Sequence, residues 1–231
     1  MLQHHRLRGL AFAVLVVSVV LAGCAADHNA RQQASASAAP ATTRLGQRQL
    51  RHMLLTLAEV QAVRSAPAGL VEQPRSSLYE DPDPRLPCGR TPTYPLTISA
   101  DAAMVAFSTG SGSDEVWVVN VVYGLAPGYA ERHLAEVRAD MRPGCQVFVS
   151  KTPFFSHQTN QFRGEVPLPP LGDDRVATSA NIWPFGGDQA FGMTARIRSG
   201  NNLATVSVVA AAPISPVFFI GLATAAAKKL A

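Results

Sequence analysis

The clearest chemical signature in this chain is the run Leu21–Cys24 (Leu-Ala-Gly-Cys), which follows basic residues and an apolar segment. Small residues directly before a cysteine, placed after such a segment, are the pattern at which bacterial lipoproteins are cleaved and acylated on the cysteine thiol. The apolar segment, 10–21, has about a dozen residues, fewer than the roughly 20 that a membrane-spanning helix needs. We expect residues 1–23 to be a signal peptide and Cys24 to carry a lipid, palmitate included. An ordinary secretory signal with an incidental cysteine is the alternative.

Two further cysteines, Cys88 and Cys145, remain if Cys24 is acylated. An even pair in an exported domain favours a disulfide, because the compartment outside the cytoplasm is oxidising. This bridge closes a loop of about 58 residues and stabilises the fold by roughly 4 kcal/mol in the chain-entropy model. Two free thiols are the alternative, although neither has a His or Lys nearby in sequence that lowers its pKa.

Other reactive side chains show no catalytic or metal-binding pattern. The six histidines lack paired metal spacing outside the signal, and we expect His133, on the polar side of a helix, and His157, in a loop, to be solvated. The acidic residues Glu80, Asp81 and Asp83 lack the alternation of a calcium loop. No nucleophile elbow, Ser-x-x-Lys or phosphate-binding loop is present. The sequence therefore predicts no catalytic residue, no metal and no cofactor.

The formal charge of +4 does not belong to the predicted folded part. Five of the 20 basic side chains and one of the 16 acidic ones precede Leu50, which leaves 15 of each after it. Nucleic-acid binding needs a concentrated basic face, so the composition predicts no nucleic-acid partner. The basic residues before Leu50 instead suit anionic lipid headgroups next to the predicted anchor.

Residues 24–49 are rich in Ala, Ser, Gln and Thr and have no apolar periodicity. This composition predicts a flexible linker between the lipid and a folded domain at 50–231. About 180 residues are enough for one domain with a sizeable core. The linker is also compatible with O-glycosylation.

Periodicity predicts an α+β domain: one antiparallel sheet of about five to six strands, with helices packed on one face. Thr56 and Glu59 have the spacing of a capping box at a helix start. In the helix after Tyr129, Arg132 and Glu136 are spaced to pair on the solvated side. The predicted helices are 57–64, 129–141 and one from Pro216 onward. The predicted strands are 104–107, 116–123, 145–150, 176–183, 191–198 and 203–210.

Several stretches resemble the PknH-like extracellular sensor domain, which occurs outside mycobacterial receptor Ser/Thr kinases and as stand-alone actinobacterial lipoproteins. They are Leu54–Val60, Ser77–Asp81 before Cys88, the Trp-containing strand, the Ala-rich helix and Cys145. Over 50–231 the resemblance implies an antiparallel sheet with packing helices and a cleft for an unidentified ligand. Members usually carry two disulfides, whereas this chain has cysteines for one besides Cys24. The resemblance supplies no catalytic residues, and the chain has no kinase domain.

Neutral hydrogen-bonding groups are concentrated in the polar segment 151–165. We expect this segment to be a loop that borders a cleft, with Gln158, Asn160 and Arg163 as ligand-binding residues. Trp183, beside a glycine-rich turn, is a further candidate, although core packing is its alternative role. Amides with one guanidinium suit a polar small molecule or a cell-wall fragment.

The sequence thus favours a non-catalytic sensor or ligand-binding lipoprotein, anchored by its N-terminal lipid at the extracytoplasmic face of the cell membrane. One alternative is an envelope hydrolase whose catalytic residues are scattered along the chain. Another is an interaction module for a membrane-protein partner.

Overall fold

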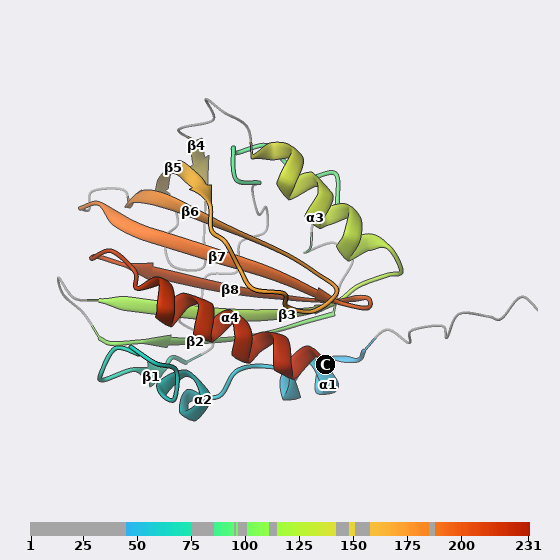
Figure 1. Cartoon of the computed structure of the whole chain (residues 1–231). Coiled ribbons are helices and arrows are strands. Elements are labelled where there is room, and N and C mark those ends of the chain that lie inside the picture. Colours follow the sequence, from blue (N-terminus) through green and yellow to red (C-terminus); the bar gives the residue numbers. More distant parts are fainter. Residues whose placement is uncertain are drawn as a thin grey trace, which may run out of the picture. The chain divides into compact units, whose positions relative to one another are not determined.

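An antiparallel sheet forms the centre of the fold (Figure 1). The structure is a computed structural model that describes residues 45–74, 86–94, 96, 101–110, 115–141, 148–150, 158–184 and 188–231. The strands, in chain order, are β1 (Val71–Glu72), β2 (Asp101–Ser108), β3 (Val116–Gly124), β4 (Phe148–Ser150), β5 (Gln158–Glu165), β6 (Asp174–Pro184), β7 (Ala190–Ser199) and β8 (Asn202–Ala210). Their order in the sheet is β1-β2-β3-β8-β7-β6-β5-β4, and all neighbours are antiparallel.

The predicted α+β class is confirmed, but the predicted strand count is wrong. In the described residues the sheet has seven strands of three or more residues, besides the two-residue β1. The main difference is β5, whose sequence QTNQFRGE has no apolar alternation and was expected to form a loop. Its backbone pairs with β4 and β6, so its strand conformation comes from neighbouring strands rather than from its own side-chain pattern.

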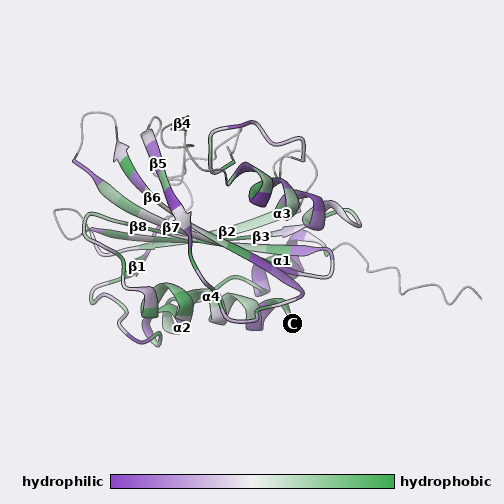
Figure 2. Ribbon diagram, turned by 45° about the horizontal axis from the view of Figure 1, so that its top comes forward, coloured by the Kyte–Doolittle hydropathy of each residue, from purple (hydrophilic) through white to green (hydrophobic). Residues whose placement is uncertain are grey.

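One face of the sheet is covered by α4 (Pro216–Leu230) together with the short helices α1 (Gln47–His52) and α2 (Leu57–Gln61). In Figure 2 these three helices lie below the sheet. Phe218, Phe219 and Leu222 of α4 are buried against alternate residues of the strands, such as Ala195 and Val206. We call this side the α4 face, and it contains the largest apolar cluster among the described residues.

The opposite side, which we call the α3 face, is covered at one end by α3 (Tyr129–Asp140; Figure 2). Leu134 and Val137 of α3 pack on Val176 of β6 and Leu203 of β8. An ion pair fixes the helix to β6, with Arg138 Nη1 3.0 Å from Asp174 Oδ2. Helices therefore lie on both faces, which differs from the prediction of one covered face. The physical reason is that Val176 and Leu203, with Tyr123 beside them, form an apolar patch at this end of the α3 face, and such a patch has to be covered.

The start of α2 follows the sequence prediction. Thr56 accepts a hydrogen bond from the Glu59 N–H, and the Glu59 carboxylate accepts one from the Thr56 N–H, which completes the capping box. The segment before it is anchored by the buried Asn120 of β3: the Leu55 N–H donates to Asn120 Oδ1 over 2.9 Å. Asn120 Nδ2 in turn donates to the Thr205 carbonyl of β8.

The described fold begins inside the segment assigned to the linker, since α1 starts at Gln47 and Leu50 is fully buried. These residues belong to a unit that spans Pro40–Ala231. Across the part of the chain that the structure describes, none of the helices has the length and apolarity needed to span a membrane.

Candidate functional site

The two faces of the sheet differ in their polarity at the centre. Strand residues alternate between faces, so Ala195 and Ile197 of β7 point to the α4 face, whereas Thr194 and Arg196 point to the α3 face. The α3-face residues in this region are mostly half-buried, while Ala195 and Ile197 are fully buried. The polar candidates for ligand contact therefore lie on the α3 face, beside α3.

Five side chains from three adjacent strands form what we call the polar band. Its members are Thr178 of β6, Thr194 and Arg196 of β7, and Thr205 and Ser207 of β8. The antiparallel register places Arg196 directly opposite Thr205, and Thr194 opposite both Ser207 and Thr178. The hydroxyl oxygens of Thr194 and Ser207 are 3.0 Å apart, so these two side chains are hydrogen-bonded. On β3, the half-buried Val121 lies opposite Thr205 and gives the band an apolar border.

His133 of α3 is the most deeply buried titratable side chain near the polar band, with 3% of its surface exposed. Its Nδ1 is 3.0 Å from the Tyr94 carbonyl oxygen, and a carbonyl can only accept, so Nδ1 carries the proton and donates. In the neutral ring Nε2 then has a free lone pair. Within the described residues, this buried Nε2 has no hydrogen-bond partner.

The expectation that His133 is solvated is therefore wrong, and the reason lies in the segment 86–94. This segment packs along the side of α3 that the sequence pattern assigns to solvent. The sequence predicted that Glu136 pairs with Arg132. Instead, the Glu136 carboxylate accepts hydrogen bonds from the Thr93 and Tyr94 N–H groups. The Arg132 guanidinium lies over the Tyr94 ring, 4.9 Å from its centroid.

Arg196 brings a positive charge next to this histidine. Burial, and after it the charge of Arg196, lower the pKa of His133 to about 4, and the contacts with Tyr94 and Glu136 only partly oppose this. Burial also lowers the pKa of Arg196 to about 10, against a raising effect of Tyr123. Both shifts have the sign expected for cationic groups removed from water.

Arg196 differs from three other arginines on this side of the sheet. Arg90, Arg138 and Arg198 each lie within 4 Å of an aspartate carboxylate. For Arg196, the described part of the chain provides neither a carboxylate partner nor a hydrogen bond, and its Nη1 is buried. Thr205 Oγ1, from the residue opposite, is also buried without a partner there. Four unsatisfied polar atoms therefore belong to adjacent elements: one donor each of Arg196 and Arg198, the Thr205 hydroxyl and the neutral acceptor of His133. Buried groups of this kind are costly unless something binds them.

Of the residues predicted to bind a ligand, Gln158, Asn160 and Trp183 lie at the far end of β6, whereas Arg163 lies beside its middle. Asn160 of β5 is opposite Ile182 and is 4% exposed, on the α3 face. Trp183 is one residue further along β6 and so points to the opposite face. Arg163 is exposed at a β-bulge between Phe162 and Gly164.

The backbone of Gln158 pairs with that of Pro184. Asn160 and Trp183 are therefore on opposite faces. Ile182 is six residues from Val176, the β6 neighbour of Arg196, which corresponds to about 20 Å along a strand. Asn160 and Trp183 are therefore distant from Arg196, whereas Arg163 lies on the strand next to Thr178, at the edge of the polar band.

Several predicted residues lie outside the described residues. They are Cys24, Glu80, Asp81, Asp83, Cys145 and His157. Cys88 is described, and its N–H donates to Asp140 Oδ2 at the end of α3, five residues before Cys145. The Cys88–Cys145 disulfide and the lipidation of Cys24 stay predictions. Among the described residues, no three His, Cys, Asp or Glu side chains gather closely enough to hold a metal ion.

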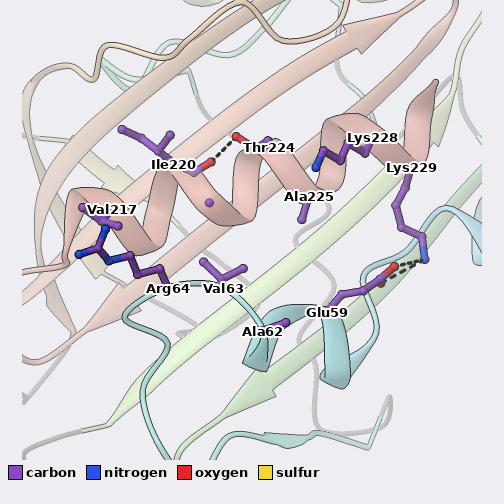
Figure 3. A pocket seen from close by; sticks show the side chains of 11 residues that line it. Glu59, Ala62, Val63, Arg64, Val217, Ile220, Thr224, Ala225, Lys228 and Lys229 are labelled. Atoms are coloured by element: carbon purple, nitrogen blue, oxygen red, sulfur yellow. Dashed lines mark hydrogen bonds and ion pairs between the residues drawn. The ribbon is translucent and has the colours of Figure 1, made fainter.

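A second surface feature is a groove of about 920 Å³ between α2 and α4, shown in Figure 3. Val63 and Ile220 contribute apolar surface, and Arg64 and Lys228 also line the groove. Lys229 Nζ donates to both carboxylate oxygens of Glu59, at 2.9 and 3.1 Å. Near its end, Val217 is 49% exposed. The groove is mainly apolar with a cationic border, whereas the α3 face offers polar groups that lack partners.

The domain consists of an eight-stranded antiparallel sheet with helices on both faces, and the α3 face of this sheet carries a polar region. Among solved structures, this fold is similar to the crystal structure of the extracellular domain of PknH from Mycobacterium tuberculosis. The TM-score is 0.56 at 13% sequence identity, over 81% of this chain and 97% of that chain. The similarity is therefore one of fold, at a distant level. No family model and no curated protein matches the sequence.

Proposed function

We propose that this protein is an extracytoplasmic, lipid-anchored binding or sensor protein of the cell envelope that recognises a polar ligand without transforming it. The observation that carries the proposal is the set of unsatisfied buried polar atoms of His133, Arg196 and Thr205. A fold tolerates such atoms at a cost, and ligand binding offsets that cost in the bound state. The similarity in fold to an extracellular domain supports the location.

The state of His133 supports binding over catalysis. A general base works best when its pKa is near the operating pH, and a histidine with a pKa of about 4 is a weak base at neutral pH. Thr205 Oγ1 and His133 Nε2 each lack a hydrogen-bond partner among the described residues, so they do not form the hydrogen-bonded pair that activates a hydroxyl nucleophile. An envelope hydrolase that uses a hydroxyl nucleophile at this place needs such a pair.

The ligand-binding role is tested by an unbiased thermal-shift screen of the full-length protein in detergent, because any ligand that prefers the native state raises the unfolding midpoint. Hits are then measured with Thr194→Val, which removes one hydroxyl of the polar band and keeps the side-chain volume. Thr224→Val on α4 is the matched control, since Thr224 donates only within its own helix. Loss of affinity in the first variant alone supports the proposed site. Turnover of a hit by the wild-type protein contradicts the non-catalytic role.

The proposed anchor is tested separately through Cys24. The mature protein from membranes is expected to begin at Cys24 and to show the added mass of acyl chains, because a single chain anchors weakly and stable anchoring takes more than one. The variant Cys24→Ser is expected to lose both the added mass and the membrane association. An unmodified wild-type N-terminus contradicts lipidation and leaves the ligand-binding proposal standing.

The groove between α2 and α4 favours a second candidate function, that of an interaction module for a membrane-protein partner. It combines apolar surface with Arg64 and Lys228, which suits an amphipathic segment that carries acidic residues. Charge reversal by Arg64→Glu distinguishes this role: it is expected to weaken partner binding and to leave ligand-induced thermal shifts unchanged.

A further inference from the structure

We propose that Arg196, Thr205 and His133 form a subsite for a hydroxylated carboxylate, such as a sugar acid. In this arrangement the carboxylate faces Arg196 and Thr205, and an adjacent hydroxyl donates to His133 Nε2. This inference rests on the proposed binding role and specifies its ligand class. The cluster does not include Gln158, Asn160, Arg163 and Trp183, the residues that the sequence pattern selects.

The charge of the ligand follows from Arg196. A guanidinium with no carboxylate partner among the described residues needs an anion, and a carboxylate matches its planar donors. Arg198, two residues further along β7, has a buried Nε without a partner, but its Nη1 is already 3.6 Å from Asp173, so Arg196 is the cation here that lacks a carboxylate among the described residues. A carboxylate carries one negative charge, whereas a phosphate monoester carries about −1.5 to −2 at neutral pH. One half-buried cation therefore favours the carboxylate.

The second ligand group follows from His133. Its Nδ1 proton is committed to the Tyr94 carbonyl oxygen, so Nε2 presents a lone pair. This lone pair repels the oxygens of an anion and accepts from a hydroxyl or an N–H group. The ligand therefore has to place a donor beside its carboxylate.

The residues around Arg196 and Thr205 indicate which further groups the ligand carries. Thr194 and Ser207 occupy the next register position beyond Arg196 and Thr205, and Thr178 is opposite Thr194. Their hydroxyls can bond to a polyol, and the bordering Val121 and Met104 offer apolar contact to its carbon skeleton. Of the ligand types considered, a hydroxylated carboxylate matches all of these neighbours.

The affinity test uses calorimetric titration of the full-length protein in detergent with three probes: D-glucuronate, D-glucose and inorganic phosphate. A ligand the size of glucuronate is expected to bind with a dissociation constant in the millimolar range. Glucose tests the need for the carboxylate, and phosphate distinguishes general anion binding from carboxylate recognition. Glucuronate is expected to bind more tightly than either.

The decisive variant is Arg196→Met, which keeps the length of the side chain and removes the charge. It is expected to weaken glucuronate binding roughly 10- to 100-fold, the range for losing a hydrogen bond to a charged group. It is also expected to raise the unfolding midpoint of the unliganded protein, because an unpaired buried charge is replaced by an apolar group. The control Arg51→Met removes an exposed charge from α1, on the other face, and is expected to leave affinity unchanged.

The outcomes separate the inference from the proposed function. Absence of saturable glucuronate binding, or binding that Arg196→Met does not weaken, overturns the inference. A lower unfolding midpoint in Arg196→Met also overturns it, because it assigns Arg196 a structural partner. If the screen yields neutral ligands that bind independently of Arg196, the binding role stands and the carboxylate subsite is wrong. Failure of the proposed function appears instead as a screen without any stabilising ligand.

Discussion

The buried His133 predicts a specific loss of stability in mild acid. Its pKa is about 4 in the folded protein and 6.5 ordinarily, because burial and the charge of Arg196 on β7 disfavour the imidazolium, while Glu136 on the same helix opposes this. Between these values the unfolded chain binds more protons than the native state. The contribution of His133 is therefore fully present above pH 6.5 and is lost as the pH falls towards 4.

The magnitude follows from the two pKa values. The whole shift corresponds to roughly 3 kcal/mol at pH 4, and the part lost between pH 7 and pH 5 is about 2 kcal/mol. The pKa values of Glu59, Glu136 and Asp174 are lowered, so their protonation destabilises the fold only at more acidic pH. In the interval from pH 7 to pH 5, the contribution of His133 is therefore larger than that of these three carboxylates.

The assay is urea unfolding of the full-length protein at pH 7 and pH 5, with His133→Asn as the test variant. An asparagine amide can still donate to the Tyr94 carbonyl oxygen but does not titrate. The variant is expected to lose about 2 kcal/mol less than the wild-type protein between the two pH values. His52→Asn is the matched control, because His52 is exposed on α1. The reasoning is refuted if His133→Asn shows the wild-type pH dependence, or if NMR titration of the native protein gives His133 a pKa above 6.

Two further predictions concern the framework of the site. Asn120→Ala is expected to lower the free energy of unfolding by about 2–5 kcal/mol. The reason is that the substitution removes the acceptor of the Leu55 N–H and the donor to the Thr205 carbonyl at a fully buried position. Urea unfolding measures this change, and a loss below about 1 kcal/mol contradicts the prediction. Non-reducing peptide mapping is expected to recover Cys88 linked to Cys145, and recovery of both as free thiols rules out the bridge.

Local sequence patterns predicted the elements whose conformation depends on near neighbours. The Thr56–Glu59 spacing correctly placed the start of α2, and the alternation in 191–198 correctly gave β7. The same alternation places Thr194 and Arg196 on one side of the strand, but by itself it predicts that this side is exposed to solvent. Only the register with β8 shows that Arg196 is opposite Thr205.

The buried histidine could not be predicted because its surroundings are distant in sequence. His133 is buried by a segment that lies about 40 residues earlier, and its Nδ1 contacts Tyr94 there. The pairing of Arg132 with Glu136 within the helix is a sound local expectation, and such a pair contributes about a few tenths of a kcal/mol. Two N–H groups from Thr93 and Tyr94 compete with it and bind the carboxylate instead. Tertiary contacts thus reassign the polar side of α3.

The separation of the two faces means that residues of the α3 face can differ without any change in the core on the α4 face. On β7, Ala195 and Ile197 need only remain apolar and of suitable size to pack against α4, whereas Thr194 and Arg196 on the other side are not constrained by that packing. The fold is similar to that of the PknH extracellular domain at 13% identity. Such a similarity requires the apolar residues that pack against α4, but it gives no information about the polar residues on the α3 face. The proposed ligand class therefore rests on the α3-face residues of this chain, and among these the guanidinium of Arg196, which has no carboxylate partner in the described part, is the strongest constraint.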